Sequence, residues 1–326
     1  MIDYSPMNAR IWARLGSCGA FGLAAMELPE VDDRVVVLTS DLCTFSGLDR
    51  FKAKFPDRLY NLGIAEQNMI GVAGGFAKEG FIPFATTYGA FASMRCADQV
   101  KVAMGYMGLP IKLVGLTSGF AVSALGATHM SLEDVAVMRA LPNVTIVEPA
   151  DCAAIVKAVI AVAKYPGPVY LRLTGPMPNA MVYQGDFPFE IGKANVLRAG
   201  SDVSLVAAGN MVSQSLKAAA ELEVEGISVE VIDMHTIRPL DHVALAKLSE
   251  RKLVVVLEEH ARVGGLGSAV LDEMAMWKSR PPVLVLGSSD DRYPLAGSYA
   301  DMLNMCGLDV EGIRQKVINT YREIKK

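Results

Sequence analysis

The chain has 326 residues, of which 52% are hydrophobic and 20% charged, and its formal net charge is -4. This composition indicates a globular protein with a large core and excludes a disordered chain. Without a long run of Lys and Arg, the sequence also excludes a nucleic-acid surface built on charge. At roughly 150 residues per domain, the length predicts two domains.

Aliphatic runs alternate with longer helical patterns in the first half of the chain. Helix starts lie between the runs: Ser131 with Asp134 resembles a capping box, and Asp151 can cap the helix that follows it. This alternation predicts an α/β fold with a mostly parallel sheet covered by helices on both faces. The predicted strands are 35–39, 59–61, 111–115, 144–147 and 169–173.

A stretch rich in Pro and Gly begins after Leu173 and is typical of a linker between domains. The alternation then resumes as a second, smaller α/β domain. We predict two doubly wound domains, at 1–178 and 191–326, with a linker at 179–190. The predicted elements of the second domain are a helix over 213–225 and strands at 203–207, 229–232, 253–257 and 283–286.

Short motifs for metals, nucleotides and export are missing from the sequence. The five cysteines form no CxxC pair, so we expect reduced thiols without zinc. HExxH, Walker and GxGxxG motifs are absent. The N-terminus carries no basic segment followed by an apolar run, and no stretch approaches the roughly 18 apolar residues of a membrane span. We therefore expect a cytoplasmic protein.

The most informative stretch is Asn61-Leu-Gly-Ile-Ala-Glu66-Gln-Asn-Met69, which joins a predicted strand to a predicted helix. A carboxylate in such a turn, among apolar and small residues, is placed to be half buried against a ligand. The alternative is that Glu66 supports the first turn of the helix, whose dipole favours negative charge. The spacing alone favours this structural role.

Two further segments carry side chains suited to a flat heterocycle. Tyr88 and Phe91 are three residues apart, so on a helix both would lie on one face and stack on a ring. His129 stands in a Gly-containing loop before a predicted helix. Taken singly, an aromatic pair is more often core packing, and a lone loop histidine is more often a surface or packed residue.

Together these segments resemble the pyrimidine domain of transketolases and deoxyxylulose-phosphate synthases, in order over about residues 8–175. Beyond the linker the chain is similar to the C-terminal domain of the same family, which depends on thiamine diphosphate. The motifs that carry the resemblance are Gly63-Ile-Ala-Glu66-Gln-Asn-Met69, Arg95-Cys-Ala-Asp98-Gln99, Ala127-Thr-His129, Met138-Arg-Ala-Leu-Pro-Asn143, Thr236-Ile-Arg-Pro-Leu240 and Glu258-Glu-His260 with Gly264-Gly-Leu-Gly267.

The resemblance implies a role for each residue of the predicted site. In such enzymes the carboxyl at the position of Glu66 hydrogen-bonds the aminopyrimidine of thiamine diphosphate and activates the cofactor. Tyr88 and Phe91 would hold that ring in an aromatic slot, with Met94 as an adaptable filler. His129 would face the substrate oxygens and help to shuttle protons.

Three further residues match family positions near the ligands. Asp41 matches a family carboxylate close to the cofactor. Arg10 and Ser46 lie near positions that contact phosphate, so an Arg can still hold an anionic tail. We include all three in the predicted site, which contains no metal ligand.

The resemblance also implies a missing part. The family's N-terminal domain, whose Gly-Asp-Gly motif and downstream Asn hold a divalent metal and the diphosphate, has no counterpart in this sequence. We therefore expect a split enzyme in which a second polypeptide holds Mg²⁺ and the diphosphate. The cofactor would lie across the interface of an α2β2 assembly, with self-association through this chain. Gene fragmentation or truncation is the alternative.

The substrate loop departs from the family pattern. Thr117 stands where a phosphate-binding His is common, and Leu125 where a substrate-binding Asp is common. Thr174 or Gly175 replaces an Arg that grips sugar phosphate. These departures predict a ketose donor with a different tail, such as a modified sugar phosphate or a sulfonated sugar.

The predicted function is that of the beta-type subunit of a two-chain transketolase, which transfers a two-carbon ketol unit from a ketose to an aldose and is active only with its partner. The beta subunit of a 2-oxoacid dehydrogenase is an alternative with the same domains, although its usual signatures differ from Ile64-Ala-Glu-Gln and Ala127-Thr-His129. A non-catalytic regulatory subunit is a second alternative. The altered loop favours it, whereas the joint presence of Glu66, Phe91 and His129 argues against it.

Overall fold

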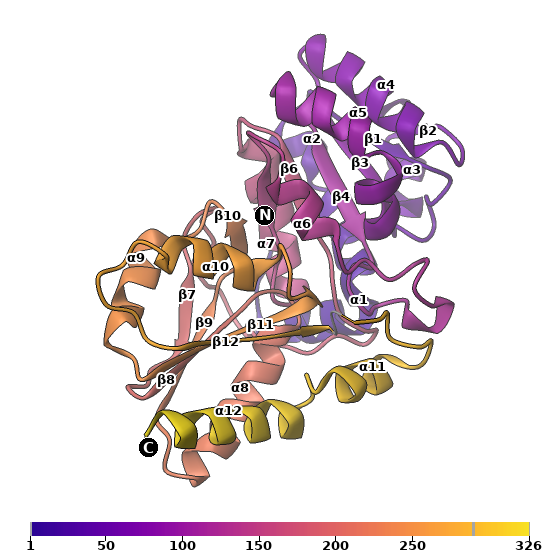
Figure 1. Ribbon diagram of the computed structural model, residues 1–326. Coiled ribbons are helices and arrows are strands. Elements are labelled where there is room, and N and C mark those ends of the chain that lie inside the picture. Colours follow the sequence, from indigo (N-terminus) through magenta and orange to yellow (C-terminus); the bar gives the residue numbers. More distant parts are fainter. Residues whose placement is uncertain (1, 289–290, 326) are drawn as a thin grey trace.

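The computed structural model describes residues 2–288 and 291–325, which form two α/β units side by side (Figure 1). The first unit contains the N-terminal half of the chain, and the second contains the C-terminal half. Among the described residues, no helix combines the length and the apolar character needed to cross a membrane. The predicted α/β class with two sheets, each mostly parallel, is confirmed.

The first unit is built on a seven-stranded sheet with strand order β10-β5-β6-β4-β3-β1-β2, in which only the β10–β5 pair is antiparallel. Its central strands are buried on both faces, as expected for a parallel sheet between helices. The strands are β1(Val35–Thr39), β2(Leu59–Asn61), β3(Ile82–Tyr88), β4(Lys112–Leu116), β5(Thr145–Val147), β6(Val169–Arg172) and β10(Thr236–Arg238).

Helices cover both faces of this sheet. Val35 and Val37 of β1 point into one core with α1, α3 and α7, while Val36 and Leu38 point into another with α4, α5 and α6. This alternation is the period of a strand packed on two sides. The helices are α1(Pro6–Ala25), α2(Leu28–Val31), α3(Asp49–Lys54), α4(Glu66–Lys78), α5(Ala97–Val100), α6(Asp134–Arg139) and α7(Cys152–Lys164), with short 3₁₀ or π turns η1(Pro56–Arg58), η2(Phe91–Arg95), η3(Lys101–Tyr106) and η4(Ser123–Leu125).

The second unit has a five-stranded sheet with order β12-β11-β8-β9-β7, in which only the β7–β9 pair is antiparallel. Helices α8 and α12 pack on one face, and α9 and α10 on the other. Its elements are β7(Asn195–Arg198), β8(Val203–Ala207), α8(Met211–Val224), β9(Val229–Asp233), α9(His242–Ala246), η5(Lys247–Glu250), β11(Leu253–Ala261), α10(Leu266–Met274), β12(Val283–Ser288), α11(Tyr299–Cys306) and α12(Val310–Ile324).

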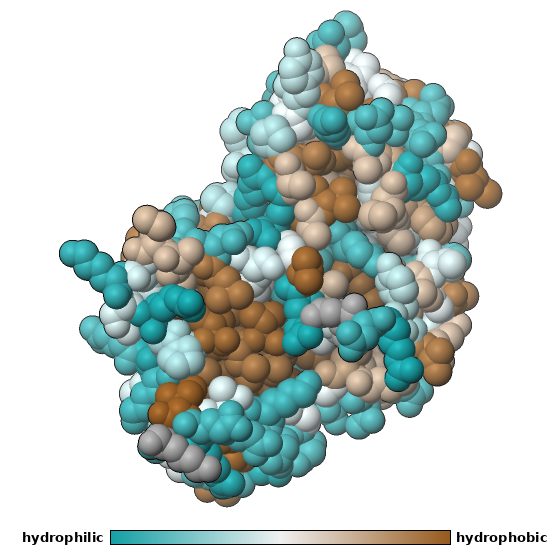
Figure 2. All heavy atoms as spheres, in the orientation of Figure 1, coloured by the Kyte–Doolittle hydropathy of each residue, from teal (hydrophilic) through white to brown (hydrophobic). Residues whose placement is uncertain are grey.

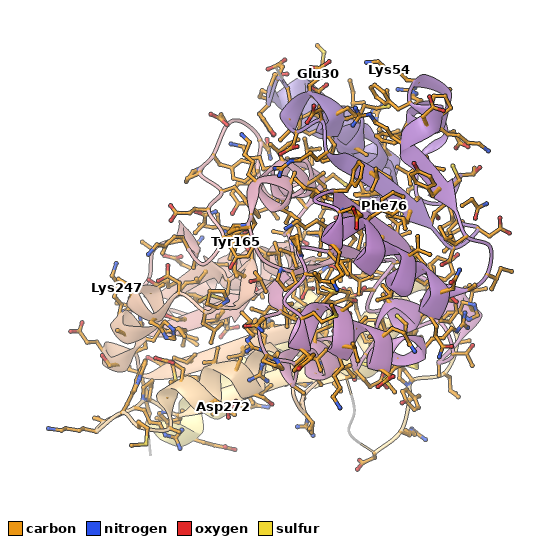
Figure 3. All side chains as sticks on the ribbon, turned by 90° about the horizontal axis from the view of Figure 1, so that it is seen from above. Glu30, Lys54, Phe76, Tyr165, Lys247 and Asp272 are labelled. Carbon is orange, nitrogen blue, oxygen red and sulfur yellow. The ribbon has the colours of Figure 1, made fainter. Side chains whose placement is uncertain are left out.

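The surface of the second unit carries a patch of hydrophobic side chains. Figure 2 shows it between α10 and α12, over the edge of the second sheet. Val283, Leu284 and Val285 of the edge strand β12 are only partly buried. In the view from above, Lys247 and Asp272 of the second unit lie away from Lys54 and Phe76 of the first, with Tyr165 between them (Figure 3).

Two local features differ from the sequence analysis. The central strand β3 was not among the predicted strands, and its Pro83 pairs with Val36 although a residue without an N–H donor is unfavourable in a central strand. The predicted capping box at Ser131 is wrong: α6 begins at Asp134 without a side-chain cap. Asp134 is drawn instead into an ion pair with Arg172. The predicted cap at Asp151 is confirmed, since its side chain accepts from the backbone N–H of Ala154.

A buried charge network joins the two units. Arg172 has no exposed side-chain surface, and its guanidinium donates to Asp134 at 2.7 and 3.1 Å and to Glu148 at 2.8 Å. The same group donates to the carbonyl oxygens of Ser131 at 2.9 Å and of Glu259, in β11 of the second unit, at 3.0 Å. Burial opposes ionisation of Asp134, but the charge and hydrogen bonds of Arg172 lower the pKa of that carboxyl below its ordinary value.

Candidate active site

Glu66 is the first residue of α4 and lies directly after the turn that follows β2. The residue is almost fully buried, with 3% of its surface exposed. Its carboxylate oxygen Oε1 accepts a hydrogen bond from Nη1 of Arg95 at 2.7 Å and lies 3.5 Å from the hydroxyl of Thr87. Both partners lie outside its own helix. The carboxylate therefore makes its contacts with η2 and β3 and does not cap its own helix.

An aromatic cluster lies at the carboxyl end of β3. The ring centroids of Tyr88 and Phe91 are 5.7 Å apart, and the ring of His129 lies 5.4 Å from Phe91 and 6.0 Å from Tyr88. Phe45, which is half exposed, adds an edge contact to Tyr88 at 5.2 Å. Four rings from three segments therefore form one wall, which suits a flat heterocycle.

The cluster arises differently from the expected shared helical face. Tyr88 is the last residue of β3 and Phe91 the first of the π turn η2, so no single helix carries both. Gly89 lies between them, where an added Cβ would stand 2.2 Å from the Ser118 hydroxyl and 3.1 Å from Cβ of Ser131. The missing side chain lets this turn approach the segment that leads to His129.

Arg95 is the residue of this site to which the sequence analysis gave no role. Its guanidinium carbon lies 3.7 Å from the centre of the Phe91 ring while its Nη1 contacts Glu66. The side chain is 42% exposed, whereas that of Glu66 is 4% exposed. The sequence did show a cation on the segment that also carries Phe91 and Met94. The direction of the Arg95 side chain could not be predicted, because it depends on the wide π turn.

His129 is partly buried beside the cluster. Its Nδ1 lies 3.0 Å from the hydroxyl of Thr128, which leaves Nε2 for another partner. Met94 is 59% exposed on the outer side of η2. The structure thus gathers Glu66, Tyr88, Phe91 and His129 around one wall, with Met94 at its rim.

The three weaker candidates lie in different surroundings. Asp41 is exposed, has a backbone φ of 57°, and exchanges hydrogen bonds with Asn61. Ser46 is fully buried, and its hydroxyl donates to the carbonyl of Leu42 at 2.7 Å. Arg10 is exposed on α1. None of these contacts joins the three residues to the aromatic wall among the residues that the structure describes.

A hollow of about 370 Å³ lies next to the aromatic wall and shares Phe45 with it. It is bounded by α1, the loop after β1 and the segments around Thr117 and Gly175. The hydroxyl of Thr117 is buried there and has no hydrogen-bond partner within residues 2–288 and 291–325. None of the described residues that line this hollow carries a charge: Leu15, Gly16, Ser17, Cys18, Gly19, Thr44, Phe45, Gly47, Thr117, Ala121, Val122, Gly175, Pro176 and Met177.

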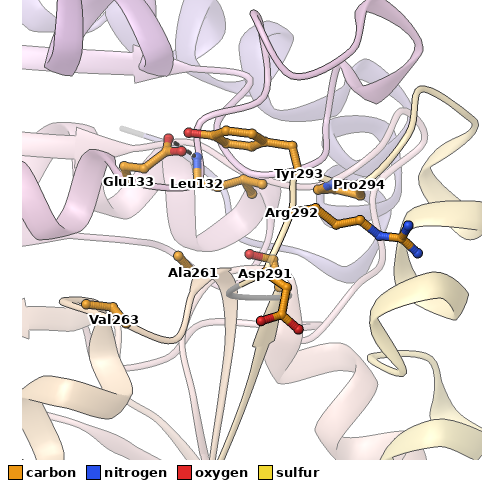
Figure 4. A pocket seen from close by; sticks show the side chains of 9 residues that line it. Leu132, Glu133, Ala261, Val263, Asp291, Arg292, Tyr293 and Pro294 are labelled. Carbon is orange, nitrogen blue, oxygen red and sulfur yellow. Dashed lines mark hydrogen bonds between the residues drawn. The ribbon is translucent and has the colours of Figure 1, made fainter.

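A second hollow, of about 340 Å³, lies between the two units (Figure 4). Tyr293 of the second unit approaches Glu133 of the first there, with Ala261 below, while the side chain of Arg292 points away from them. A hydrogen bond to Glu133 raises the pKa of the Tyr293 hydroxyl. This hollow is separate from the aromatic wall. Among the described residues, no cluster of three His, Cys, Asp or Glu side chains is placed to hold a metal.

Comparison with known families gives two matches along the chain. Residues 17–177 match the model of the transketolase pyrimidine binding domain, and residues 192–313 match that of the transketolase C-terminal domain. These matches define a chain with two domains of the transketolase type, a pyrimidine binding domain and a C-terminal domain. The chain belongs to the transketolase family, as the sequence analysis predicted.

Individual relatives specify the kind of transketolase chain to which this one is similar. The protein of Clostridium sp. described as "6-deoxy-6-sulfo-D-fructose transketolase subunit SqwH" is 42% identical over 248 residues, which cover 76% of this chain and 77% of the relative. A subunit of an apulose-4-phosphate transketolase from Phocaeicola vulgatus is 35% identical over 88% of this chain and 92% of its own. A solved structure, "Split gene transketolase, inactive beta4 tetramer", has a TM-score of 0.83 at 36% identity and covers 93% of this chain and 97% of that one. The chain is a transketolase-type transferase subunit of the beta kind.

Proposed function

We propose that this chain provides the pyrimidine-binding half of a thiamine-diphosphate site and, with an alpha-type partner, transfers a two-carbon ketol unit from a ketose to an aldose. One observation carries the proposal: a buried carboxylate, Glu66, stands beside the aromatic wall of Tyr88, Phe91 and His129. A buried carboxylate next to a ring-sized aromatic surface suits an aminopyrimidine, which offers a flat face and ring nitrogens.

The residues of this half-site divide the work. Tyr88 and Phe91 would hold the pyrimidine ring, and Met94 would adapt to its edge. Glu66 would hydrogen-bond a ring nitrogen and so set the protonation state of the ring. When bound, thiamine diphosphate supplies a carbon nucleophile that adds to the ketose carbonyl. His129 would hold the substrate oxygens and move a proton through its free Nε2.

The other half of the site belongs, in this proposal, to a partner chain. That chain would hold Mg²⁺ and the diphosphate, and the complex would be an α2β2 heterotetramer with contacts between its beta subunits. The similar solved structure supports this arrangement, since it is described as an inactive tetramer of beta chains. The other two relatives are named as subunits.

We further propose that the donor has a non-standard tail, either modified or sulfonated. The uncharged hollow beside Phe45 supports this, because a phosphate carries about −1.5 to −2 charges at neutral pH and is usually held by Arg or Lys. A sulfonate is less charged and requires less compensation. Thr117, at a position where the family commonly has His, lines this hollow, and so does Gly175, one of the two residues that can stand at the position of the family's Arg.

The test uses the complex reconstituted with the alpha-type chain. Glu66→Gln should lower kcat by roughly 10²- to 10⁴-fold, the range of general acid–base catalysis, while assembly is retained. Glu79→Gln, at the exposed C-terminal end of the same helix, is the matched control and should keep full activity. Unchanged activity of Glu66→Gln would remove the mechanism. If xylulose 5-phosphate gave the highest turnover among the donors tested, the proposal of a non-standard tail would be wrong, whereas the proposed transketolase activity would stand.

A further inference from the structure

Arg95 occupies both contacts that the proposed cofactor ring requires. Its Nη1 is hydrogen-bonded to the Oε1 of Glu66 at 2.7 Å, and its guanidinium lies over the ring of Phe91 at 3.7 Å. A guanidinium at this distance covers the ring face on which another flat group would stack. Arg95 therefore takes the place of a stacked, nitrogen-bearing ring in the free subunit.

The pairing also determines the form of the Glu66 carboxyl. A guanidinium has only donors and carries a positive charge, so the oxygen that faces it acts as an acceptor, and the ion pair holds the carboxyl of Glu66 in its ionised form. A carboxyl that donates a hydrogen bond to a ring nitrogen must instead carry a proton. An ionised carboxyl has no proton to donate, so the ion pair with Arg95 and a hydrogen bond donated to the ring exclude each other.

The surroundings of Glu66 leave Arg95 as the cation in contact with it among the described residues. Thr87 adds a neutral hydroxyl at 3.5 Å, and Cys96 lies close enough that burial, together with the charge of Glu66, raises the pKa of its thiol to about 12. Cys96 thus stays neutral near pH 7. Within the described part of the chain, no second Arg or Lys side chain forms an ion pair with this carboxylate in place of Arg95.

The position of Arg95 also allows its side chain to move away from Glu66. Its side chain is 42% exposed and stands on the one-turn π segment η2, beside the exposed Met94. An ion pair with one partner in water is weak, because water competes for the guanidinium. Moving this side chain into solvent requires no rearrangement of a helix or strand.

We propose that Arg95 is a positioning residue of the cofactor site, which keeps Glu66 ionised and covers Phe91 until the pyrimidine ring displaces it. The inference rests on the proposed function. On binding, the Glu66–Arg95 ion pair breaks, the guanidinium moves to solvent, and the carboxyl takes a proton from solvent to donate it in a hydrogen bond to the ring. Cofactor binding is thus coupled to the uptake of about one proton.

The test is calorimetry of thiamine diphosphate with Mg²⁺ on the reconstituted complex, in two buffers that differ in ionisation enthalpy. The wild-type complex should take up about one proton. Arg95→Met should bind the cofactor roughly tenfold more tightly, since no ion pair has to be broken, and should take up fewer protons. Arg50→Met, at an exposed arginine of α3, is the control and should match the wild type.

Equal affinity and equal proton uptake in Arg95→Met would overturn the inference, and so would weaker binding, because Arg95 would then hold the cofactor. If Arg95→Met does not assemble, Arg95→Lys is measured instead. It keeps the charge but not the planar stacking, so binding should tighten with proton uptake unchanged, and unchanged affinity would overturn the inference. Failure of the wild-type complex to bind the cofactor would remove the proposed function itself.

Discussion

Two buried carboxylates of this chain pair with an arginine at 2.7 Å, but their surroundings differ. Asp134 and Arg172 are both fully buried, and each nitrogen of the guanidinium donates to a carboxylate or a carbonyl, with acceptors from both units. Glu66 is nearly as buried, but the side chain of its partner Arg95 is 42% exposed and packs on the ring of Phe91.

The two ion pairs differ in the burial of the arginine, and this difference indicates how easily each pair can be broken. A buried ion pair with all its hydrogen bonds made is costly to break, since each separated charge would remain in a medium of low polarity. A pair with one exposed partner can exchange that partner at small cost. We therefore assign the Arg172 pair to the junction of the units and the Arg95 pair to ligand exchange.

The largest expected effect is that of removing the buried cation. Arg172→Met leaves Asp134 and Glu148 without their partner and should lower the free energy of unfolding by about 3–5 kcal/mol. Urea denaturation measures the change. Arg95→Met is the control and should cost less, because it leaves one buried carboxylate, Glu66, without its cation instead of two. Equal losses in the two variants would contradict the comparison.

A third buried carboxylate, that of Asp233, has a neutral hydroxyl as its hydrogen-bond partner instead of an arginine. Its Oδ2 accepts from the hydroxyl of Tyr183 at 2.7 Å, and burial raises its pKa from 3.8 to about 8. Between these values the folded chain keeps a proton that the unfolded chain has lost, so this contribution to stability is full below pH 3.8 and is lost as pH rises through about 8.

The slope from this single group is up to about 1.4 kcal/mol per pH unit. Asp233→Asn keeps the shape and the acceptor without the titration. Urea unfolding at about pH 5 and about pH 7 should therefore show a smaller loss of stability with rising pH in the variant than in the wild type. An identical pH dependence in the two proteins would show that Asp233 is ionised in the folded chain.

A smaller effect is expected on the aromatic wall. Phe91→Ala removes the ring that faces both Arg95 and His129 and should weaken binding of thiamine diphosphate to the complex about 3- to 10-fold, the size of an aromatic contact. Calorimetry measures it. Phe45→Ala, which removes a half-exposed ring at the outer edge of the wall, should change the affinity less. The reverse order would place the ring-binding surface at Phe45.

The smallest effect is expected at the rim of the wall. Met94 is mostly exposed, so Met94→Leu keeps apolar bulk where little packing is made and should change cofactor affinity and stability by less than about twofold and about 0.5 kcal/mol. A larger change in affinity alone would move Met94 from the rim to direct contact with the ring.

The sequence predicted the parts of this protein that depend on local pattern. The runs 35–39 and 203–207 form strands with the predicted bounds, since a strand buried on both faces of a parallel sheet is largely apolar along its whole length. Tyr88 and Phe91 meet as predicted, although a strand end and a π turn bring them together. The motif around Glu66 identified the family because its residues are contiguous.

Contacts between distant segments were decided by the tertiary structure alone. Strand β10, from the second half of the chain, pairs with β5 and completes the first sheet, which the apolar pattern of three residues cannot indicate. Arg172 reaches Glu259, and Arg95 reaches Glu66, only because the folded sheets bring these segments together. The sequence by itself determined the α/β class and the family, and it predicted Glu66 as the carboxylate of the proposed site. The tertiary structure decided which arginine faces that carboxylate, because the direction of a side chain follows from the turn that carries it and from the neighbours against which it packs.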